Sequence, residues 1–151
     1  MQKRQEMLMY WTNMVTNVFL DTNIIMDIFD ENRKSHQASF SLVKELLSNE
    51  VTLYVNSDTL TTTFYLLRSQ KKASFKDVLY AIRETTNICE LVSIESEDVE
   101  KTLLLCEDKN NKINDYEDAL QYVCAKKVNA DLIVTNDKGF VSLDILVQGT
   151  K

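Results

Sequence analysis

Short apolar runs alternate with longer segments of helical periodicity along most of this chain. The runs are rich in β-branched residues, as buried strands are. They fall at Val18–Leu20, Val51–Val55, Ile88–Val92, Leu132–Val134 and Asp144–Val147. Strands that are separated by helices pair in parallel and are covered by those helices on both faces. The alternation therefore predicts an α/β fold, a three-layer α/β/α sandwich around a mostly parallel sheet of about four to five strands.

The segments between these runs place apolar residues on one helical face and begin with residues that suit helix caps. Ser57 and Asp58 are the expected cap after the second strand, and Asn114 with Glu117 is the expected cap before the fourth. The predicted helices run from Ile24 to Phe29, Arg33 to Ser48, Thr59 to Arg68, Ser74 to Thr85, Ser96 through Cys106, and Asn114 to Lys127.

The length of 151 residues suits one domain, and no Pro or Gly-rich linker divides the chain. Residues 1–16 show no clear period, so we treat them as an N-terminal extension of unknown role. Met14 is an alternative natural start. Residues 17–151 are expected to form the single domain.

The charge balance argues against a generally basic nucleic-acid binder. Lys and Arg number 17 and Asp and Glu number 23, which gives a net charge of -6. An enzyme that acts on nucleic acid remains compatible with this balance if the negative charge gathers in one cleft. A divalent cation would offset the charge there and attract phosphate.

The cysteines and the hydropathy pattern indicate a reduced cytoplasmic protein without a membrane segment. Cys89, Cys106 and Cys124 are odd in number and widely spaced, as reduced core cysteines often are. The absence of C-x-x-C and the single His exclude the common zinc patterns. No apolar stretch approaches the roughly 18 residues of a membrane span.

Two predicted strands end on acids. Asp21 directly follows Val18–Leu20, and Asp137 comes shortly after Leu132–Val134. Ligands and catalytic groups gather at the carboxyl ends of parallel strands, so both acids are candidates for function. The structural alternative for Asp21 is a simple cap on the helix that begins near Ile24.

A third acidic segment opens the last predicted helix, where Asp115 and Asp118 lie three residues apart and share one face. Acids at a helix start are also favoured by the dipole, by about 0.3 to 1 kcal/mol each, and we prefer this interpretation for Glu117. Carboxylates brought together from three segments would repel one another unless a cation held them. Oxygen ligands without Cys or His select Mg²⁺ or Mn²⁺, which indicates metal-assisted hydrolysis of a phosphodiester.

At these residues the chain resembles the PIN-domain ribonucleases, which include the toxin halves of bacterial VapBC toxin and antitoxin pairs. The resemblance covers roughly residues 17 to 147. Its motifs are Phe19–Asn23, Asp115–Leu120, and Ile133–Asp137 followed by Phe140. It implies a parallel sheet with an acidic Mg²⁺ or Mn²⁺ pocket and endonucleolytic cutting of an RNA substrate. It also implies a cognate antitoxin and often a homodimer.

The resemblance assigns roles by position. The acids that match the family's catalytic, metal-binding residues are Asp21, Asp118 and Asp137. Asp115, one turn before Asp118, would be an accessory metal ligand. The polar residues that match neighbours orienting the acids or the water are Thr22, Asn23 and Thr135.

The chain departs from the family on the helix after the second strand. The family commonly has a Glu there, and our alignment puts Thr63 in its place. A hydroxyl binds water but supplies no negative charge, although Asp58, one turn earlier, is a candidate to compensate. This leaves open a PIN-like domain that binds RNA or protein with little or no catalysis. A phosphatase or phosphotransferase with Asp21 as nucleophile ranks last, because D-x-D chemistry requires an acid where Asn23 stands.

The sequence does not identify the RNA target. Specificity would depend on the shape of the cleft and on scattered cations such as Arg33, Lys34, Arg68, Lys71 and Lys72. An ordinary solvated surface is the preferred interpretation of these cations.

Overall fold

Five parallel strands form one sheet in the computed structural model, which describes residues 15–151. The strands are β1 (Asn17–Leu20), β2 (Thr52–Asn56), β3 (Cys89–Val92), β4 (Leu132–Val134) and β5 (Leu146–Gln148). Their order across the sheet is β3-β2-β1-β4-β5, and every neighbouring pair is parallel. The predicted sheet is confirmed.

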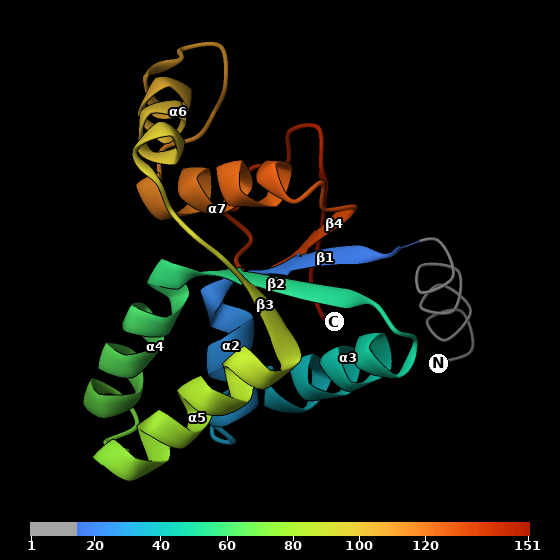
Figure 1. Ribbon diagram of the computed structural model, residues 1–151, viewed down its shortest axis with the longest axis vertical. Helices are drawn as coiled ribbons and strands as arrows, with labels where there is room; N and C mark the ends of the chain where they lie inside the picture. Colours follow the sequence, from blue (N-terminus) through green and yellow to red (C-terminus); the bar gives the residue numbers. More distant parts are fainter. Residues whose placement is uncertain (1–14) are drawn as a thin grey trace.

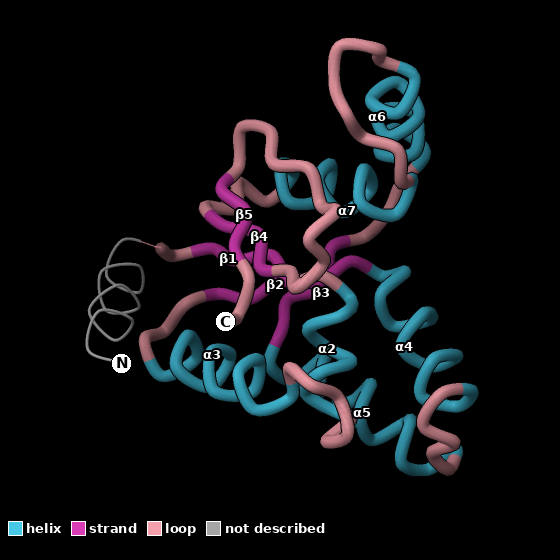
Figure 2. The backbone as a smooth tube through the Cα atoms, turned by 180° about the vertical axis from the view of Figure 1, so that it is seen from behind, coloured by secondary structure: helices cyan, strands magenta, loops and turns pink. Residues whose placement is uncertain are grey.

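Helices cover both faces of this sheet (Figure 1). They are α2 (Thr22–Phe29), α3 (His36–Ser48), α4 (Ser57–Ser69), α5 (Phe75–Ile88), α6 (Ser96–Glu107) and α7 (Tyr116–Lys127). The helices from α2 to α5 lie on one side, while α7 packs on the other with α6 against it, and the view from behind agrees (Figure 2). The three-layer α/β/α sandwich is therefore confirmed.

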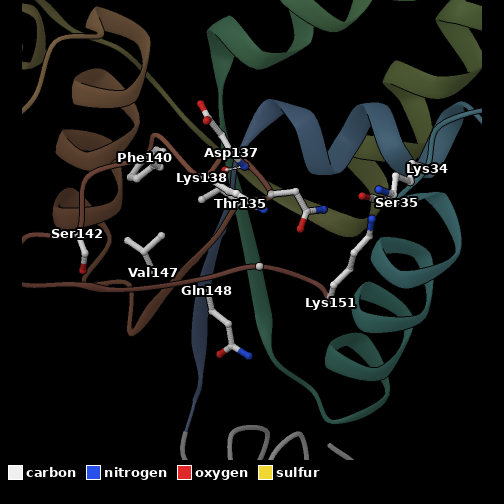
Figure 3. Close-up of a pocket in the computed structure, with 12 residues that line it drawn as sticks. Lys34, Ser35, Thr135, Asp137, Lys138, Phe140, Ser142, Val147, Gln148 and Lys151 are labelled. Atoms are coloured by element: carbon white, nitrogen blue, oxygen red, sulfur yellow. Dashed lines mark hydrogen bonds between the residues drawn. The ribbon is translucent and has the colours of Figure 1, made fainter.

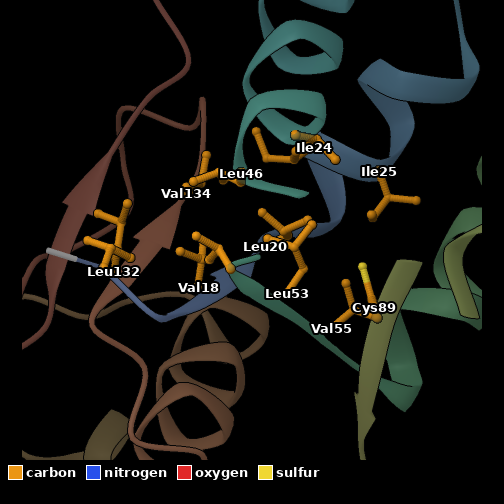
Figure 4. Close-up of a cluster of buried hydrophobic side chains, with 13 residues drawn as sticks. Val18, Leu20, Ile24, Ile25, Leu46, Leu53, Val55, Cys89, Leu132 and Val134 are labelled. Atoms are coloured by element: carbon orange, nitrogen blue, oxygen red, sulfur yellow. The ribbon is translucent and has the colours of Figure 1, made fainter. Parts of the chain in front are cut away.

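The core forms because alternate residues of each strand face opposite layers. Val18 and Leu20 of β1 are fully buried toward α2 and α3, in the apolar cluster of Figure 4. Phe19, between them, points to the other face and packs with Ile133 and Leu120. A shift of β1 by one residue relative to its neighbouring strands would turn each of these side chains to the opposite layer. Burial on both faces therefore fixes the register of β1, and with it the position of Asp21 after the strand.

The order of the strands creates a crevice beside β1. The chain adds β2 and β3 on one side of β1 and then returns to add β4 and β5 on the other. Connections leave β1 and β4 in opposite directions at such a switch point, and ligands bind there in open α/β sheets. The backbone N–H of Asp21 donates to the carbonyl of Val134 at 3.0 Å, which joins the two strand ends.

Helix α4 begins earlier than predicted. Asn56, the last residue of β2, caps it by accepting the Thr59 N–H at 3.0 Å. The predicted cap of Ser57 and Asp58 is wrong, because the extended backbone of Asn56 already turns the chain into the helix.

The predicted extension falls mostly outside the described residues, since residues 1–14 are not described. Val15 is buried, and Thr16 donates its backbone N–H to Asp131 Oδ2 at 3.0 Å. The packed part of the described chain therefore includes both residues.

The cysteines are spread over the fold and do not pair with one another. All three cysteines are free, with Cys89 and Cys124 buried and Cys106 half-buried. Between residues 15 and 151, no helix has the length and apolar character needed to cross a membrane.

Candidate metal centre and active site

An acidic hollow of about 240 Å³ lies at the carboxyl ends of β1 and β4. The carboxylates that line it are Asp21, Asp115, Glu117, Asp118 and Asp137. The fold thus brings together the acids that the sequence predicts from three separate segments. Across residues 15–151, no group of three or more His, Cys, Asp or Glu side chains is already spaced to hold a metal ion.

Asp21 is fixed by two side-chain donors. It is 5% exposed, and its Oδ2 accepts from Thr135 Oγ1 at 2.6 Å and from Asn23 Nδ2 at 3.0 Å. Burial raises the pKa of Asp21, and the hydrogen bond from Thr135 opposes that rise. Asp21 stands at the N-cap position of α2, but its side chain makes no capping hydrogen bond. The simple capping role is therefore not what holds this carboxylate.

Thr135 links Asp21 to the loop that carries Asp137. Its hydroxyl accepts from the Asp137 N–H at 3.0 Å and from Asn23 Nδ2 at 3.1 Å. Asp137 Oδ1 in turn accepts from the Gly139 N–H at 2.8 Å. A Cβ at position 139 would lie 3.2 Å from that same oxygen, so glycine suits the tight loop.

The start of α7 presents Asp115 and Asp118 to the hollow. Asp115 caps the helix, because its Oδ1 accepts the Asp118 N–H at 3.0 Å. The predicted cap of Asn114 with Glu117 is wrong by one residue, since Asp115 itself has the extended backbone of a cap. Capping occupies one oxygen of Asp115 and leaves the other for a ligand.

The hollow concentrates negative charge. Burial, followed by the charges of Asp115, Asp21 and Asp137, raises the pKa of Asp118 to about 7. Burial also raises the pKa of Glu117. Arg33 lines the hollow, but its Nε is bound to Asp27 at 2.8 Å. Several hard oxygen donors without a matching cation suit a divalent ion such as Mg²⁺ or Mn²⁺.

Glu117 and Gln121 belong to the site, although the sequence did not mark them. Glu117 Oε1 accepts from Thr22 Oγ1 at 3.2 Å and from Gln121 Nε2 at 3.3 Å. Gln121 is 1% exposed, and its Oε1 has no hydrogen-bond partner within residues 15–151. Gln121 could have been noticed from the sequence, because it is a single polar residue, one turn after Glu117, in an otherwise apolar stretch of α7. Thr22, which was predicted to orient an acid, contacts Glu117.

The threonine of α4 that faces the hollow is Thr62, whereas Thr63 was expected there. Thr62 and Leu66, one turn apart, line the hollow. Thr63 is fully buried on a different face, and its hydroxyl has no partner within the described part of the chain. Successive residues of a helix differ by about 100° in direction, so these two neighbouring threonines face different sides of α4.

A buried polar cluster supports the loop after β4. Asp27, 2% exposed, accepts from Ser39 Oγ at 2.6 Å, Arg33 Nε at 2.8 Å and Asn136 Nδ2 at 3.0 Å. The Asn136 N–H donates to Asn23 Oδ1 at 3.2 Å. The loop next to Asp137 is thereby tied to α2 and α3. Asp27 could have been noticed from the sequence, because it is an acid one turn after Asn23 in a predicted helix that is rich in Ile and Met.

Solved structures of similar fold include two DNA-bound VapBC proteins and one protein described as a toxin. VapBC2 from Rickettsia felis, bound to a DNA fragment from its promoter, matches with a TM-score of 0.65 and 19% identity over 89% of this chain and 98% of that one. DNA-bound VapBC from Salmonella typhimurium matches with a TM-score of 0.62 and 16% identity, covering 90% and 99%. VapC20 from Mycobacterium tuberculosis, described as a sarcin-ricin loop cleaving toxin, matches with a TM-score of 0.64 and 15% identity, covering 83% and 98%. These identities support likeness of fold alone.

Sequence comparison finds a relative of higher identity than these structures. Ribonuclease VapC1 from Aquifex aeolicus is 45% identical over 135 residues, which is 89% of this chain and 90% of that protein. Residues 17–139 match the family model described as the PIN domain. The match spans all three acidic segments that meet at the end of β1, and the chain therefore belongs to the PIN-domain family.

Proposed function

We propose that this chain is a metal-dependent endoribonuclease that hydrolyses RNA phosphodiester bonds. The observation that carries the proposal is the meeting of Asp21, Asp118 and Asp137 in one hollow at the switch point of the sheet. The 45% identity to Ribonuclease VapC1 supports RNA as the substrate.

The proposed metal ligands are Asp21, Asp115, Asp118 and Asp137, with Mg²⁺ or Mn²⁺ as the ion. A bound divalent ion would supply an activated water and neutralise charge on the phosphate. Glu117 lies beside them and contributes negative charge to the same hollow.

The polar neighbours keep the acids in place. Thr135 and Asn23 hold one oxygen of Asp21, while Thr22 and Gln121 hold Glu117. Groups already oriented by hydrogen bonds need little rearrangement when the substrate binds.

Cleavage of labelled RNA by the purified chain tests this proposal, with Mg²⁺, with Mn²⁺ and with EDTA. We expect Asp21→Asn and Asp137→Asn each to lower the rate by about 100-fold or more. Asp58→Asn is the matched control, because Asp58 is exposed in α4 and does not line the hollow. Equal cleavage by Asp21→Asn and the unaltered chain would overturn the proposal.

A catalytically weak PIN domain that binds RNA or protein is the second candidate function. It is favoured by the hydroxyl of Thr62 at the position facing the hollow, and by the finding that no three acids among the described residues are already spaced to hold a metal ion. Calorimetric titration with Mg²⁺ and Mn²⁺ separates the two candidates. No heat of binding at about millimolar metal, together with no cleavage, supports binding alone.

We further propose that the chain is a cytoplasmic toxin neutralised by a cognate antitoxin. An apolar groove of about 390 Å³ between α3 and α5 supports this, because Phe40 and Tyr80, which are 45% and 63% exposed, line it. Leu47→Asp, in the same groove, should abolish capture of the protein encoded by a neighbouring small open reading frame. Unchanged capture would place the antitoxin elsewhere.

The proposal includes a homodimer, which the family resemblance implies. Leu103 and Leu104 of α6 are 40% and 57% exposed and offer one apolar surface for it. Light scattering during size-exclusion chromatography tests this, and a monomeric mass at every concentration would remove the homodimer from the proposal.

A further inference from the structure

A second hollow, of about 510 Å³, adjoins the acidic one (Figure 3). Lys34 lies before α3, Lys138 follows β4 and Lys151 follows β5, and all three line this hollow, which we call the lysine groove. Asp137 lines both hollows. Three segments therefore bring positive charge to the edge of the acidic site.

The charges of the lysine groove are not used inside the protein. Across residues 15–151, none of its three ammonium groups forms an ion pair, whereas Lys71 and Lys126 each bind a nearby carboxylate. Asp137 is the only acidic side chain among the residues that line the groove. A local excess of positive charge on a chain of net charge -6 attracts an anion to this place in particular.

The groove suits phosphates better than bases. Phe140, the aromatic residue in its lining, is 8% exposed and packs in the core with Phe19 and Ile133. It therefore presents no free ring on which a base could stack. Lysine ammonium groups bind phosphate as point charges and carry no base-specific pattern.

We infer that the lysine groove binds the backbone phosphates of a single-stranded RNA segment next to the cleaved bond. The inference rests on the proposed ribonuclease function for the identity of the polyanion. The carboxylates of the acidic hollow repel an approaching phosphate, and the neighbouring lysines offset that repulsion. Because Asp137 belongs to both hollows, a strand with one phosphate at Asp137 continues into the groove.

RNA binding by a variant that does not cleave tests the inference. The full chain carries Asp21→Asn, and the probe is an unstructured, fluorescein-labelled RNA of about 12 nucleotides, followed by fluorescence anisotropy. Lys34→Gln, Lys138→Gln and Lys151→Gln are combined in this background. We expect the Kd at about 0.1 M salt to rise at least about tenfold. The slope of log K against log salt should fall by about 2, since each phosphate contact on a single strand contributes about 0.7.

The matched control removes the same charge elsewhere, with Lys44→Gln, Lys76→Gln and Lys109→Gln in the same background. These lysines are exposed and make no ion pair within residues 15–151. The control should keep its slope and bind within about twofold of the parent. If the groove triple variant melts early, Lys34→Gln and Lys138→Gln are measured singly, each with an expected drop in slope of about 0.7.

Three results would overturn the inference: unchanged RNA binding by the groove variants, an equal loss in both triple variants, or intact RNA binding with lost binding of the purified antitoxin. The last result would assign the groove to an acidic protein segment. Failure of the proposed function looks different. An unaltered chain that binds RNA through the groove but does not cut it would leave the groove assignment standing and remove the nuclease.

Discussion

The hydroxyl of Thr135 donates a 2.6 Å hydrogen bond to Oδ2 of Asp21, between the ends of β4 and β1. Loss of this donor in Thr135→Val should leave Asp21 poorly oriented and lower the cleavage rate by about 10- to 100-fold, as losses of ligand-supporting groups do. Thr135→Ser keeps the hydroxyl and should recover most of the rate. Single-turnover cleavage assays with melting curves measure both variants, and full activity in Thr135→Val would contradict the assigned role.

The raised pKa of Asp118 makes the metal-free protein less stable as pH rises. The pKa of Asp118 is about 7 in the folded state, against an ordinary value of 3.8. Between these two pH values the folded state therefore keeps a proton on Asp118 that the unfolded state has lost. The free energy of unfolding attributable to Asp118 therefore falls between about pH 4 and pH 7. Urea denaturation in EDTA at several pH values measures this, and Asp118→Asn should flatten the dependence.

The same proton competes with the metal ion. Affinity for Mg²⁺ or Mn²⁺ should rise with pH up to about 7, because binding requires the ionised Asp118. Calorimetric titrations on either side of pH 7 measure the change. An affinity that is constant over this range would show that Asp118 is not a ligand.

Thr62→Glu should add a carboxylate on the face of α4 that lines the hollow. We expect divalent metal to bind about tenfold more tightly, because an added acidic ligand strengthens such sites. The metal-free variant should be less stable by about 1 kcal/mol, because the new charge faces four or more others. Thr61→Glu adds the same charge at an exposed position of α4 and should change neither property. Equal metal affinity in the two variants would contradict the prediction.

Asp27→Ala should lower the free energy of unfolding by about 2 to 4 kcal/mol, because it removes the buried carboxylate that accepts from Ser39, Arg33 and Asn136. Urea denaturation measures the loss. Asp27 and Asn136 share one network, so the double variant with Asn136→Ala should lose less than the sum of the single losses. Strict additivity would mean that the two side chains act independently.

The sheet and the convergence of the acids were predictable, since both depend on strand order and on where each apolar run stops. Asp21 and Asp137 follow buried strands, so their place near one edge of a parallel sheet needs no knowledge of side-chain packing. The directions of side chains on helices were harder to predict, because each step of one residue along a helix rotates the side chain by about 100°. Thr63 was therefore aligned where Thr62 faces the hollow.

Three further polar residues, in the site or beside it, were missed for a related reason. Gln121 and Asp27 are polar positions inside apolar helices, and only the packed structure gives them partners. Glu117 sits in the first turn of α7, where the helix dipole already explains an acid. Its contact with Thr22 depends on how α7 lies across the sheet.

The central place of β1 also affects when the site first exists during synthesis. β1 is made early, yet its neighbour β4 is Leu132–Val134, and residues 21–131 must be made in between. A nascent chain that has not released β4 from the ribosome has Asp21 without Thr135 beside it. The acidic centre is therefore incomplete until β4 has left the ribosome and pairs with β1.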